Sequence, residues 1–305
     1  MRPIALLVAS LAGALVILAA GSSTVVQTTI PSRTAAPSPT GRPMPAPTSP
    51  PAFGRSERAA LTRALDRYLA HRPGDLSVSV REVTTGLDFT YNGNLRTATA
   101  SIVKVDIVIA LLLRAQREER ALTASERALA EKAIKVSDNS AASALWNEIG
   151  GAAGLASANR RLGLRHTDPG PGGAWGATTT SAADQVRLLA ALTSDRSTLH
   201  ASGRRYLRHL MADVTPEQAW GVSAAAGDGA EVALKNGWLP REVHGGRWTV
   251  NSIGLVRDAG RLFLVAAVSE RDPALEKGIA AVEHACASVV AALARAVSSD
   301  RASQR

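Results

Sequence analysis

The spacing of hydrophobic residues early in the chain predicts one helix followed by a β-hairpin. Apolar residues recur at helical spacing in RSERAALTRALDRYLAHR, residues 55–72, so this segment is predicted to be an amphipathic helix. The next segment, LSVSVREV, alternates between apolar and polar residues with a period of two, as a half-buried strand does. A turn at TTGLD leads to a second short strand, FTYNG, which completes the hairpin.

Helical patterns fill the middle of the chain, from about residue 101 to residue 211, and strand patterns return only after them. Three later segments are predicted to be strands: EVALKNGW, RWTVNSIGLVR and RLFLVAAVSE, the last two joined by a tight DAG turn. Residues 272–297 close the pattern with apolar residues at helical spacing.

The order of these elements predicts an α+β fold. A two-stranded hairpin is barely stable alone, so the early and late strands are expected to share one sheet. The result is a five-stranded antiparallel sheet flanked by N- and C-terminal helices, with an inserted all-helical subdomain. Any cleft is expected at the seam between the sheet and this insertion, where active sites commonly lie.

The N-terminal part of the chain carries a location signal. Residues 4–20 are apolar and uncharged, so residues 1–21 are predicted to be a signal peptide or a membrane anchor. Residues 22–54 hold eight of the fifteen prolines and predict a disordered linker rich in Pro, Ser and Thr. The folded domain is expected over residues 55–298, with a polar tail at 299–305. An extracytoplasmic protein is expected, either secreted or anchored to the membrane by residues 1–21. No cysteine follows the apolar run, so attachment of a lipid there is not expected.

Composition says little about the fold, but it limits the kinds of binding partner to be expected. The chain of 305 residues is 46% hydrophobic and 20% charged, which suffices for a large core. Its net charge of +9 favours anionic surfaces, but the basic residues are scattered and few aromatics accompany them, so nucleic acid is not expected. The single cysteine, Cys286, cannot form an intramolecular disulfide and is expected to pack as a small hydrophobic residue.

The first stretch with chemical potential is TASIVK, in which Ser101 and Lys104 open an apolar run. Their spacing of three places both side chains on one face of a helix that begins around Ser101. A serine hydroxyl becomes a nucleophile when a neighbour removes its proton, and a lysine of lowered pKa can do so. The alternative is that two polar residues simply begin a buried helix.

Two further motifs have equally ordinary alternatives. Residues 137–139, Ser-Asp-Asn, precede an Ala-rich helix, and by themselves they are typical of a helix N-cap. Residues 235–237, Lys-Asn-Gly, interrupt a strand pattern and could form a hairpin turn. The apolar continuation of this segment fits a strand that runs on, with Gly237 allowing a ligand close to the backbone.

Taken together, in this order and on these elements, the three motifs resemble the serine β-lactamase and penicillin-binding protein superfamily, most of all the class A β-lactamases. The resemblance extends from about residue 55 to residue 297, and TTTS and VNSIGLV agree with it. It implies that Ser101 is the acylated nucleophile and Lys104 its base. Ser137 would relay protons to the leaving nitrogen, and Lys235 would supply positive charge to the serine pair and the substrate carboxylate.

The same resemblance implies a set of substrate-binding residues. Asn139 would hold the substrate amide and Lys104, and Gly237 would lie close to the substrate. The oxyanion hole would consist of the backbone N–H groups of Ser101 and Trp238. Asn236 stands where the family pattern has a hydroxyl residue, and its amide could donate to a carboxylate.

A second departure concerns release of the acyl group. Class A enzymes activate the deacylating water with a glutamate in a loop before the Thr-rich segment, and the corresponding region here, RLGLRHTDPGPGGAWGATTT, has no glutamate. His166 falls at about that place, with Asp168 nearby, and an imidazole can act as a general base at neutral pH. The alternative is a surface histidine beside a turn-forming Asp-Pro-Gly.

The sequence therefore predicts an exported serine hydrolase that forms an acyl-enzyme with a β-lactam or a cell-wall peptide amide. One rival is a D-alanyl-D-alanine peptidase or transpeptidase of the penicillin-binding type, and another is a non-catalytic cell-wall binding domain that retains the fold. The chain lacks G-x-S-x-G, H-E-x-x-H and a Gly-rich phosphate loop, so neither a cofactor nor a metal is implied.

Overall fold

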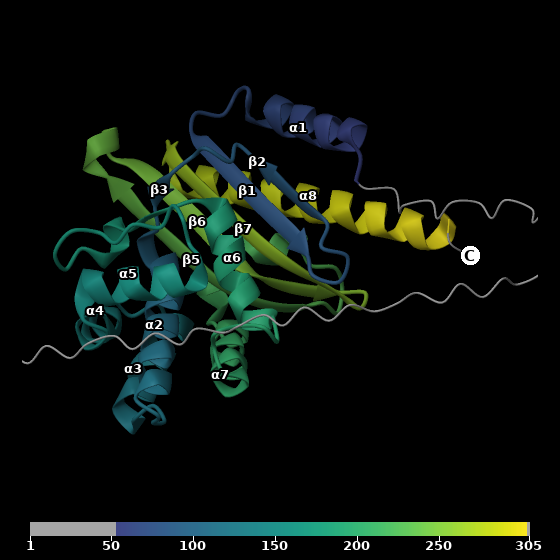
Figure 1. Cartoon of the computed structure of the whole chain (residues 1–305). Helices are drawn as coiled ribbons and strands as arrows, with labels where there is room; N and C mark the ends of the chain where they lie inside the picture. The colour runs from purple at the N-terminus through teal and green to yellow at the C-terminus, as the bar shows by residue number, and fades with distance from the viewer. Residues whose placement is uncertain (1–52, 304–305) are drawn as a thin grey trace, which may run out of the picture. The chain divides into compact units, whose positions relative to one another are not determined.

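The predicted α+β fold is present in the computed structural model, which describes residues 53–303 (Figure 1). The eight helices of the described part are α1 (Arg55–Leu69), α2 (Val103–Arg117), α3 (Ala124–Lys135), α4 (Asn139–Glu148), α5 (Gly151–Leu162), α6 (Ala182–Thr193), α7 (Ala201–Ala212) and α8 (Leu275–Ser303). The strands of the main sheet are β1 (Asp75–Glu82), β2 (Asp88–Tyr91), β5 (Glu231–Arg241), β6 (Arg247–Asp258) and β7 (Arg261–Asp272).

The main sheet has five antiparallel strands in the order β2-β1-β7-β6-β5, so the early hairpin and the late strands do share one sheet. The turn between β6 and β7 consists of Ala259 and Gly260, whose φ angles are 46° and 72°. Two consecutive left-handed residues are what a two-residue hairpin turn requires. Strand β5 pairs only with β6 and forms one edge of the sheet, and this edge becomes important for the site.

The sheet is covered on both faces, and Figure 1 shows α1 and α8 on one side and the helical insertion on the other. Strand β7 illustrates the two cores. Phe263, Val265 and Ala267 face the core shared with α1 and α8. Their neighbours Leu264, Ala266 and Val268 face the core shared with the insertion. Burial on both faces explains why this strand is an uninterrupted apolar run rather than an alternating one.

Helix α8 packs against β1, β6 and β7 through a continuous buried stripe. Cys286 lies fully buried in this stripe, as expected for a small hydrophobic residue, and burial raises the pKa of its thiol. The segment from Leu275 to Ser298 is long and apolar enough to cross a membrane, but it is the core helix that covers the sheet.

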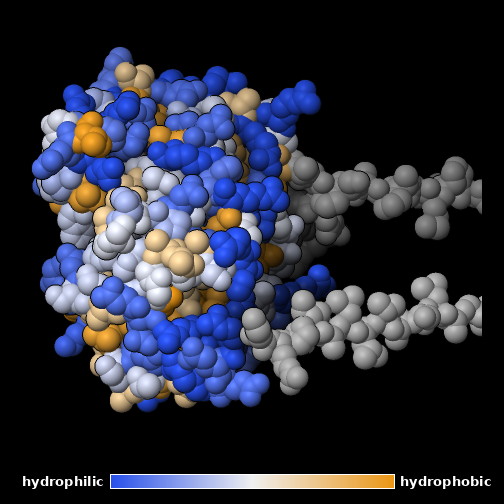
Figure 2. Space-filling model, turned by 60° about the vertical axis from the view of Figure 1, so that its left-hand side comes forward, coloured by the Kyte–Doolittle hydropathy of each residue, from blue (hydrophilic) through white to orange (hydrophobic). Residues whose placement is uncertain are grey.

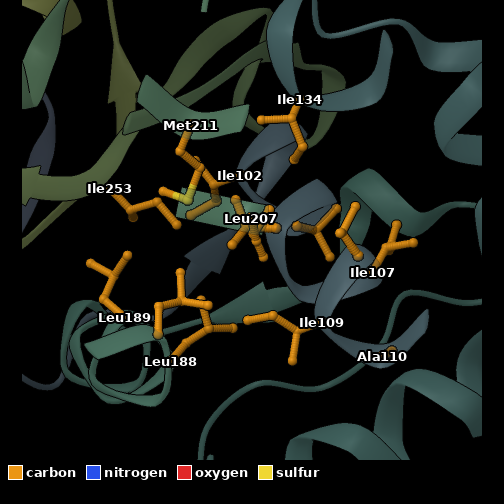
Figure 3. Packing of buried hydrophobic residues seen from close by; sticks show 14 of the residues in the cluster. Ile102, Ile107, Ile109, Ala110, Ile134, Leu188, Leu189, Leu207, Met211 and Ile253 are labelled. Atoms are coloured by element: carbon orange, nitrogen blue, oxygen red, sulfur yellow. The ribbon is translucent and has the colours of Figure 1, made fainter. Parts of the chain in front are cut away.

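Helix α2 forms the centre of the insertion. Figure 3 shows its apolar residues surrounded by side chains from α3, α6, α7 and the inner face of the sheet. The labelled residues of α2 are Ile107, Ile109 and Ala110, and Ile102 lies just before the helix. The surrounding residues are Ile134, Leu188, Leu189, Leu207, Met211 and Ile253. Because nearly every face of α2 is buried, the residues at its N-terminal end are held rigidly.

The ends of the expected domain differ slightly from those observed. The predicted signal segment and nearly all of the predicted linker lie outside the described residues. Phe53, which the linker was expected to include, is buried and meets the ring of Phe89 edge-on at 6.1 Å. At the other end the backbone of α8 continues through Ser303, beyond the expected boundary at residue 298.

Candidate active site

Ser101 lies in a short turn of 3₁₀ helix, η1 (Ala100–Ile102), and α2 follows directly from Val103. The sequence predicted one helix from about Ser101, so the prediction is right to within this turn. Ala100 has a φ of 48°, an unusual value for a residue with a side chain. The left-handed residue redirects the chain just before Ser101, whose side chain is half-buried while its neighbours are fully buried.

Two sets of bonds fix the chain before Ser101. The first is a two-stranded ladder, unforeseen in the sequence, between β3 (Thr97–Ala98) and β4 (Thr179–Thr180). The second involves Asn251 on β6, fully buried, whose Nδ2 donates to Ala98 O at 2.8 Å and to Thr99 O at 3.0 Å. The turn that carries Ser101 is therefore attached to the sheet by a buried amide.

Gly237 on β5 lies directly against this turn. A Cβ added to Gly237 would be 2.6 Å from the backbone nitrogen of Ser101, 2.7 Å from that of Ile102 and 2.8 Å from Thr99 O. Only glycine permits such an approach. The β5 edge thus supports the backbone of Ser101, and the strand continues past Gly237 to Arg241, which rules out the hairpin-turn alternative.

The Ser-Asp-Asn motif supplies both a helix N-cap and hydrogen-bond acceptors for Lys104. Asp138 is the N-cap of α4 and accepts from Ala141 N at 2.6 Å. Its two neighbours face Lys104 instead. The Lys104 ammonium donates to Ser137 O at 2.5 Å, to Ser137 Oγ at 3.1 Å and to Asn139 Oδ1 at 2.8 Å. Ser137 has a φ of 58°, a strained value of the kind that clusters at functional sites.

Lys235 on β5 reaches the same hydroxyl from the other side. Its Nζ donates to Ser137 Oγ at 3.0 Å and to Asn236 O at 3.0 Å, and it lies 3.5 Å from Gln218 Oε1. Ser137 Oγ is therefore shared by two lysines, both with fully buried side chains. We call Lys104, Ser137 and Lys235 the lysine–serine cluster.

Burial controls the protonation of this cluster. It lowers the pKa of Lys104 to about 8 from the ordinary 10.5, although the Asp138 carboxylate opposes the shift. Burial and, second, the charge of Lys104 lower the pKa of Lys235 to about 7. Near neutral pH the two lysines are therefore not both fully protonated, and in the free protein Lys235 has the lower pKa.

One sequence prediction needs correction. Asn236 was expected to donate to a substrate carboxylate, but its side chain is fully buried. Both hydrogens of its amide are used, since Nδ2 donates to Gln218 O at 2.7 Å and to Trp220 O at 3.0 Å. The side chain lies on the opposite side of the strand from the expected one, and it anchors the segment that carries Gln218 to β5.

The loop before the Thr-rich segment places an aromatic side chain over Lys104. Trp175, in the short helix η2 (Trp175–Ala177), places its ring centroid 5.0 Å from Lys104 Nζ. Its Nε1 donates to Ser143 Oγ on α4 at 3.1 Å. An indole face thus covers the ammonium, a favourable cation–π arrangement.

His166, from the same loop, has an exposed side chain, and its backbone N–H donates to Asp184. Among the described residues its imidazole makes no hydrogen bond or ion pair. Its role as a deacylation base stays a prediction from the sequence.

The sequence alone did not identify Trp175, Gln218 or Asn251 as parts of the site. Each comes from a segment without a recognisable motif, and each matters through a contact across the fold. Asn251 lies within VNSIGLV, which had been noted only as a supporting match. Within residues 53–303, no group of three or more His, Cys, Asp or Glu residues is arranged to hold a metal ion.

This fold and these motifs define a protein of the β-lactamase-like serine hydrolase superfamily. The chain belongs to the Beta-lactamase2 family, described as the "Beta-lactamase enzyme family", which it matches over residues 60–126 and 120–298.

Known proteins agree with this assignment. "Putative lipoprotein LppW" of Mycobacterium tuberculosis is 31% identical over 226 residues, which cover 72% of this chain and 71% of that protein; its Mycobacterium bovis counterpart matches equally. The crystal structure of the TLA-1 extended-spectrum β-lactamase superposes with a TM-score of 0.70 at 17% identity, covering 77% of this chain and 99% of that one. A mutant of PBP-A, solved as an acyl-enzyme complex with penicillin G, gives a TM-score of 0.67 at 19% identity, with coverage of 78% and 97%. At these identities the two structures show a shared fold.

Proposed function

We propose that this protein is an exported active-site serine hydrolase in which Ser101 becomes acylated by β-lactams or related cell-wall amides. The observation that carries the proposal is the lysine–serine cluster, in which two buried lysines share the hydroxyl of Ser137. Strand β5 supplies Lys235 to this cluster and also brings Gly237 against the backbone of Ser101. Burying two amines around one hydroxyl is costly for stability, and catalysis is the physical reason to retain it. A purely structural domain gains nothing from this arrangement, which argues against the non-catalytic rival.

The proposed reaction requires Lys104 in its neutral form, which its pKa of about 8 brings within reach near neutral pH. Lys104 takes the proton of Ser101, and Ser101 Oγ attacks the carbonyl carbon of the amide. The backbone N–H groups of Ser101 and Trp238 would stabilise the oxyanion, a contribution of about 3 kcal/mol for each donor.

The carbon–nitrogen bond then breaks. Ser137 gives its proton to the leaving nitrogen and recovers one from Lys104, to which it is already hydrogen-bonded. A bound substrate carboxylate would favour the protonated form of Lys235, whose positive charge would then hold it. With a β-lactam, the opened ring stays attached to Ser101, so the adduct retains the full mass of the drug.

Release of the acyl group is expected to be slow. The Lys104 ammonium faces the Trp175 indole, and between Leu162 and Ser181 the only acidic residue is Asp168, which is exposed. An indole cannot activate water. Both enzyme classes form the same acyl-enzyme and differ in how fast they release it. Slow release favours a peptidase or transpeptidase of the penicillin-binding type over an efficient β-lactamase.

The proposed location is extracytoplasmic. The hydrophobic N-terminal segment and the lipoprotein name of the mycobacterial relatives support it. The only cysteine of this chain is buried in α8, so an anchor in this sequence would be the hydrophobic segment itself.

Labelling with a fluorescent penicillin tests the function. The wild-type chain is expected to become labelled and to keep the label through a chase with unlabelled drug, whereas Ser101→Ala stays unlabelled. Rapid loss of label with drug turnover would instead indicate a β-lactamase. A wild-type protein that is folded by circular dichroism but takes no label would refute the proposal.

A further inference from the structure

A cavity of about 580 Å³ lies between α7 and the outer strands of the sheet, and none of its lining residues belongs to the lysine–serine cluster. Helix α7 forms one wall, and β5 and β6 form the other. The volume falls within the range of small-molecule sites, about 300–1,000 Å³. Figure 2 shows one face of the molecule, on which hydrophilic residues predominate and hydrophobic residues are scattered.

The cavity is lined by an unusual concentration of positive charge. Three arginines come from one helix, Arg204, Arg205 and Arg208, and Arg257 comes from β6. We call the cavity lined by these four residues the arginine groove. On α7, residues three and four apart are neighbours, so the positive charges of Arg204 and Arg205 both act on Arg208. His209 also lines the cavity.

The carboxylates of the groove do not neutralise this charge. Asp195 pairs with Arg204 at 2.8 Å, but the Asp195 side chain is 99% exposed. Glu231 lies 3.5 Å from Arg257, and its side chain is 80% exposed. Both carboxylates are open to solvent, so salt screens their attraction to the two arginines. No further acidic residue lines the cavity within the described part of the chain.

Two guanidinium groups have no carboxylate partner. Arg208 donates to the backbone oxygen of Leu192, and Arg205 makes no hydrogen bond or ion pair with any described residue. Burial, followed by the charges of Arg204, Arg257 and Arg205, lowers the pKa of Arg208. The free protein therefore holds a partly buried cation among like charges, a cost that a bound anion would remove.

We propose that the arginine groove binds a phosphate group. Guanidinium is planar and presents paired N–H donors that match phosphate oxygens, and several guanidinium groups suit a group with more than one negative charge better than a single carboxylate. The phosphate could belong to a soluble phosphorylated molecule or to a lipid headgroup, because both present the same oxygens. This inference is independent of the acylation chemistry.

Calorimetric titration of the full-length chain with inorganic pyrophosphate at low salt tests the groove. Binding is expected in the wild type and should weaken as salt rises. The double variant R205Q/R208Q should bind about tenfold more weakly or worse, the loss of at least one charge-assisted hydrogen bond. Its melting temperature without ligand should equal or exceed that of the wild type, because like-charge repulsion is removed.

The matched control is R63Q/R67Q, which removes the same charge from exposed positions on α1. It should bind pyrophosphate as the wild type does. Vesicles identify the source: if phosphatidylglycerol vesicles bind and phosphatidylcholine vesicles do not, the phosphate belongs to a headgroup, whereas binding of pyrophosphate alone indicates a soluble ligand. Failure of the wild type to bind either probe, or an equal loss in both double variants, would overturn the proposal.

Discussion

Replacing Gly237 with alanine perturbs the site at a single point of contact. Gly237 is not in the left-handed region, so alanine can adopt its backbone conformation and the effect is purely steric. The added methyl group would lie 2.6 Å from Ser101 N, 2.7 Å from Ile102 N and 2.8 Å from Thr99 O. All three atoms belong to the backbone, so no side chain can rotate away and either β5 or η1 must move.

The expected magnitude follows from that displacement. Overpacking of this kind costs about 1–3 kcal/mol of stability, which corresponds to a loss of roughly 2–4 °C in melting temperature for each kcal/mol. Moving Ser101 N relative to Trp238 N separates the two proposed oxyanion donors. A misplacement of about 1 Å lowers the acylation rate by about a hundredfold.

Stopped-flow acylation with a chromogenic β-lactam, together with thermal melting, measures both effects. The control is Gly203→Ala on α7, where the added methyl group meets only side-chain atoms of Leu112 and Leu199 at 3.5 Å or more. Alanine in that helix should leave acylation unchanged and slightly raise the melting temperature. Acylation of Gly237→Ala at the wild-type rate would refute the close approach between β5 and the turn that carries Ser101.

Substitutions at four further positions test the lysine pKa values and the release of the acyl group. Asp138→Asn keeps the N-cap but removes the carboxylate that raises the pKa of Lys104. The midpoint of the pH profile for acylation should therefore fall below about 8, by up to about one pH unit. An unchanged midpoint would exclude Lys104 as the titrating base. Lys235→Met should abolish acylation yet raise the melting temperature at pH 7. The pKa of Lys235 is about 7 in the folded protein and 10.5 for an ordinary lysine, so between these pH values folding must expel a proton, which costs stability. The gain in melting temperature should therefore shrink towards pH 10, and a lower melting temperature of the variant at pH 7 would contradict this linkage argument. Trp175→Ala should speed adduct release several-fold by admitting water to Lys104, with Trp175→Phe close to wild type; equal release from all three would remove the indole from the release step. His166→Ala is expected to slow adduct release, because an imidazole can act as a general base at neutral pH, and unchanged release would remove His166 from the mechanism.

Much of this architecture could be predicted because periodicity and spacing report on local structure. Alternation in β1 and helical spacing in α1 locate those elements without any tertiary information. The motifs were informative for a different reason: Lys104 and Lys235 are charged residues in otherwise buried segments, and such residues need a partner. Two-residue strands such as β3 and β4 are too short to show a period, so they escaped detection.

The remaining features depend on contacts between distant segments. Asn251 and Ala98 are far apart in sequence, and only the fold brings them together. Trp175 lies in a loop rich in Gly and Pro, whose path is set by what it packs against rather than by its own preferences. The error at Asn236 has a simple cause: adjacent residues on a strand point to opposite sides, and the motif did not say which side faces the cleft.

The mass of the intact protein after incubation with a penicillin tests the central claim most directly. The account predicts that the wild-type chain gains the full mass of the drug, that peptide mapping places the adduct on Ser101, and that the adduct persists long after free drug is removed. The same incubation should leave Ser101→Ala unmodified. A wild-type chain of unchanged mass, or an adduct located on any other residue, would contradict the account.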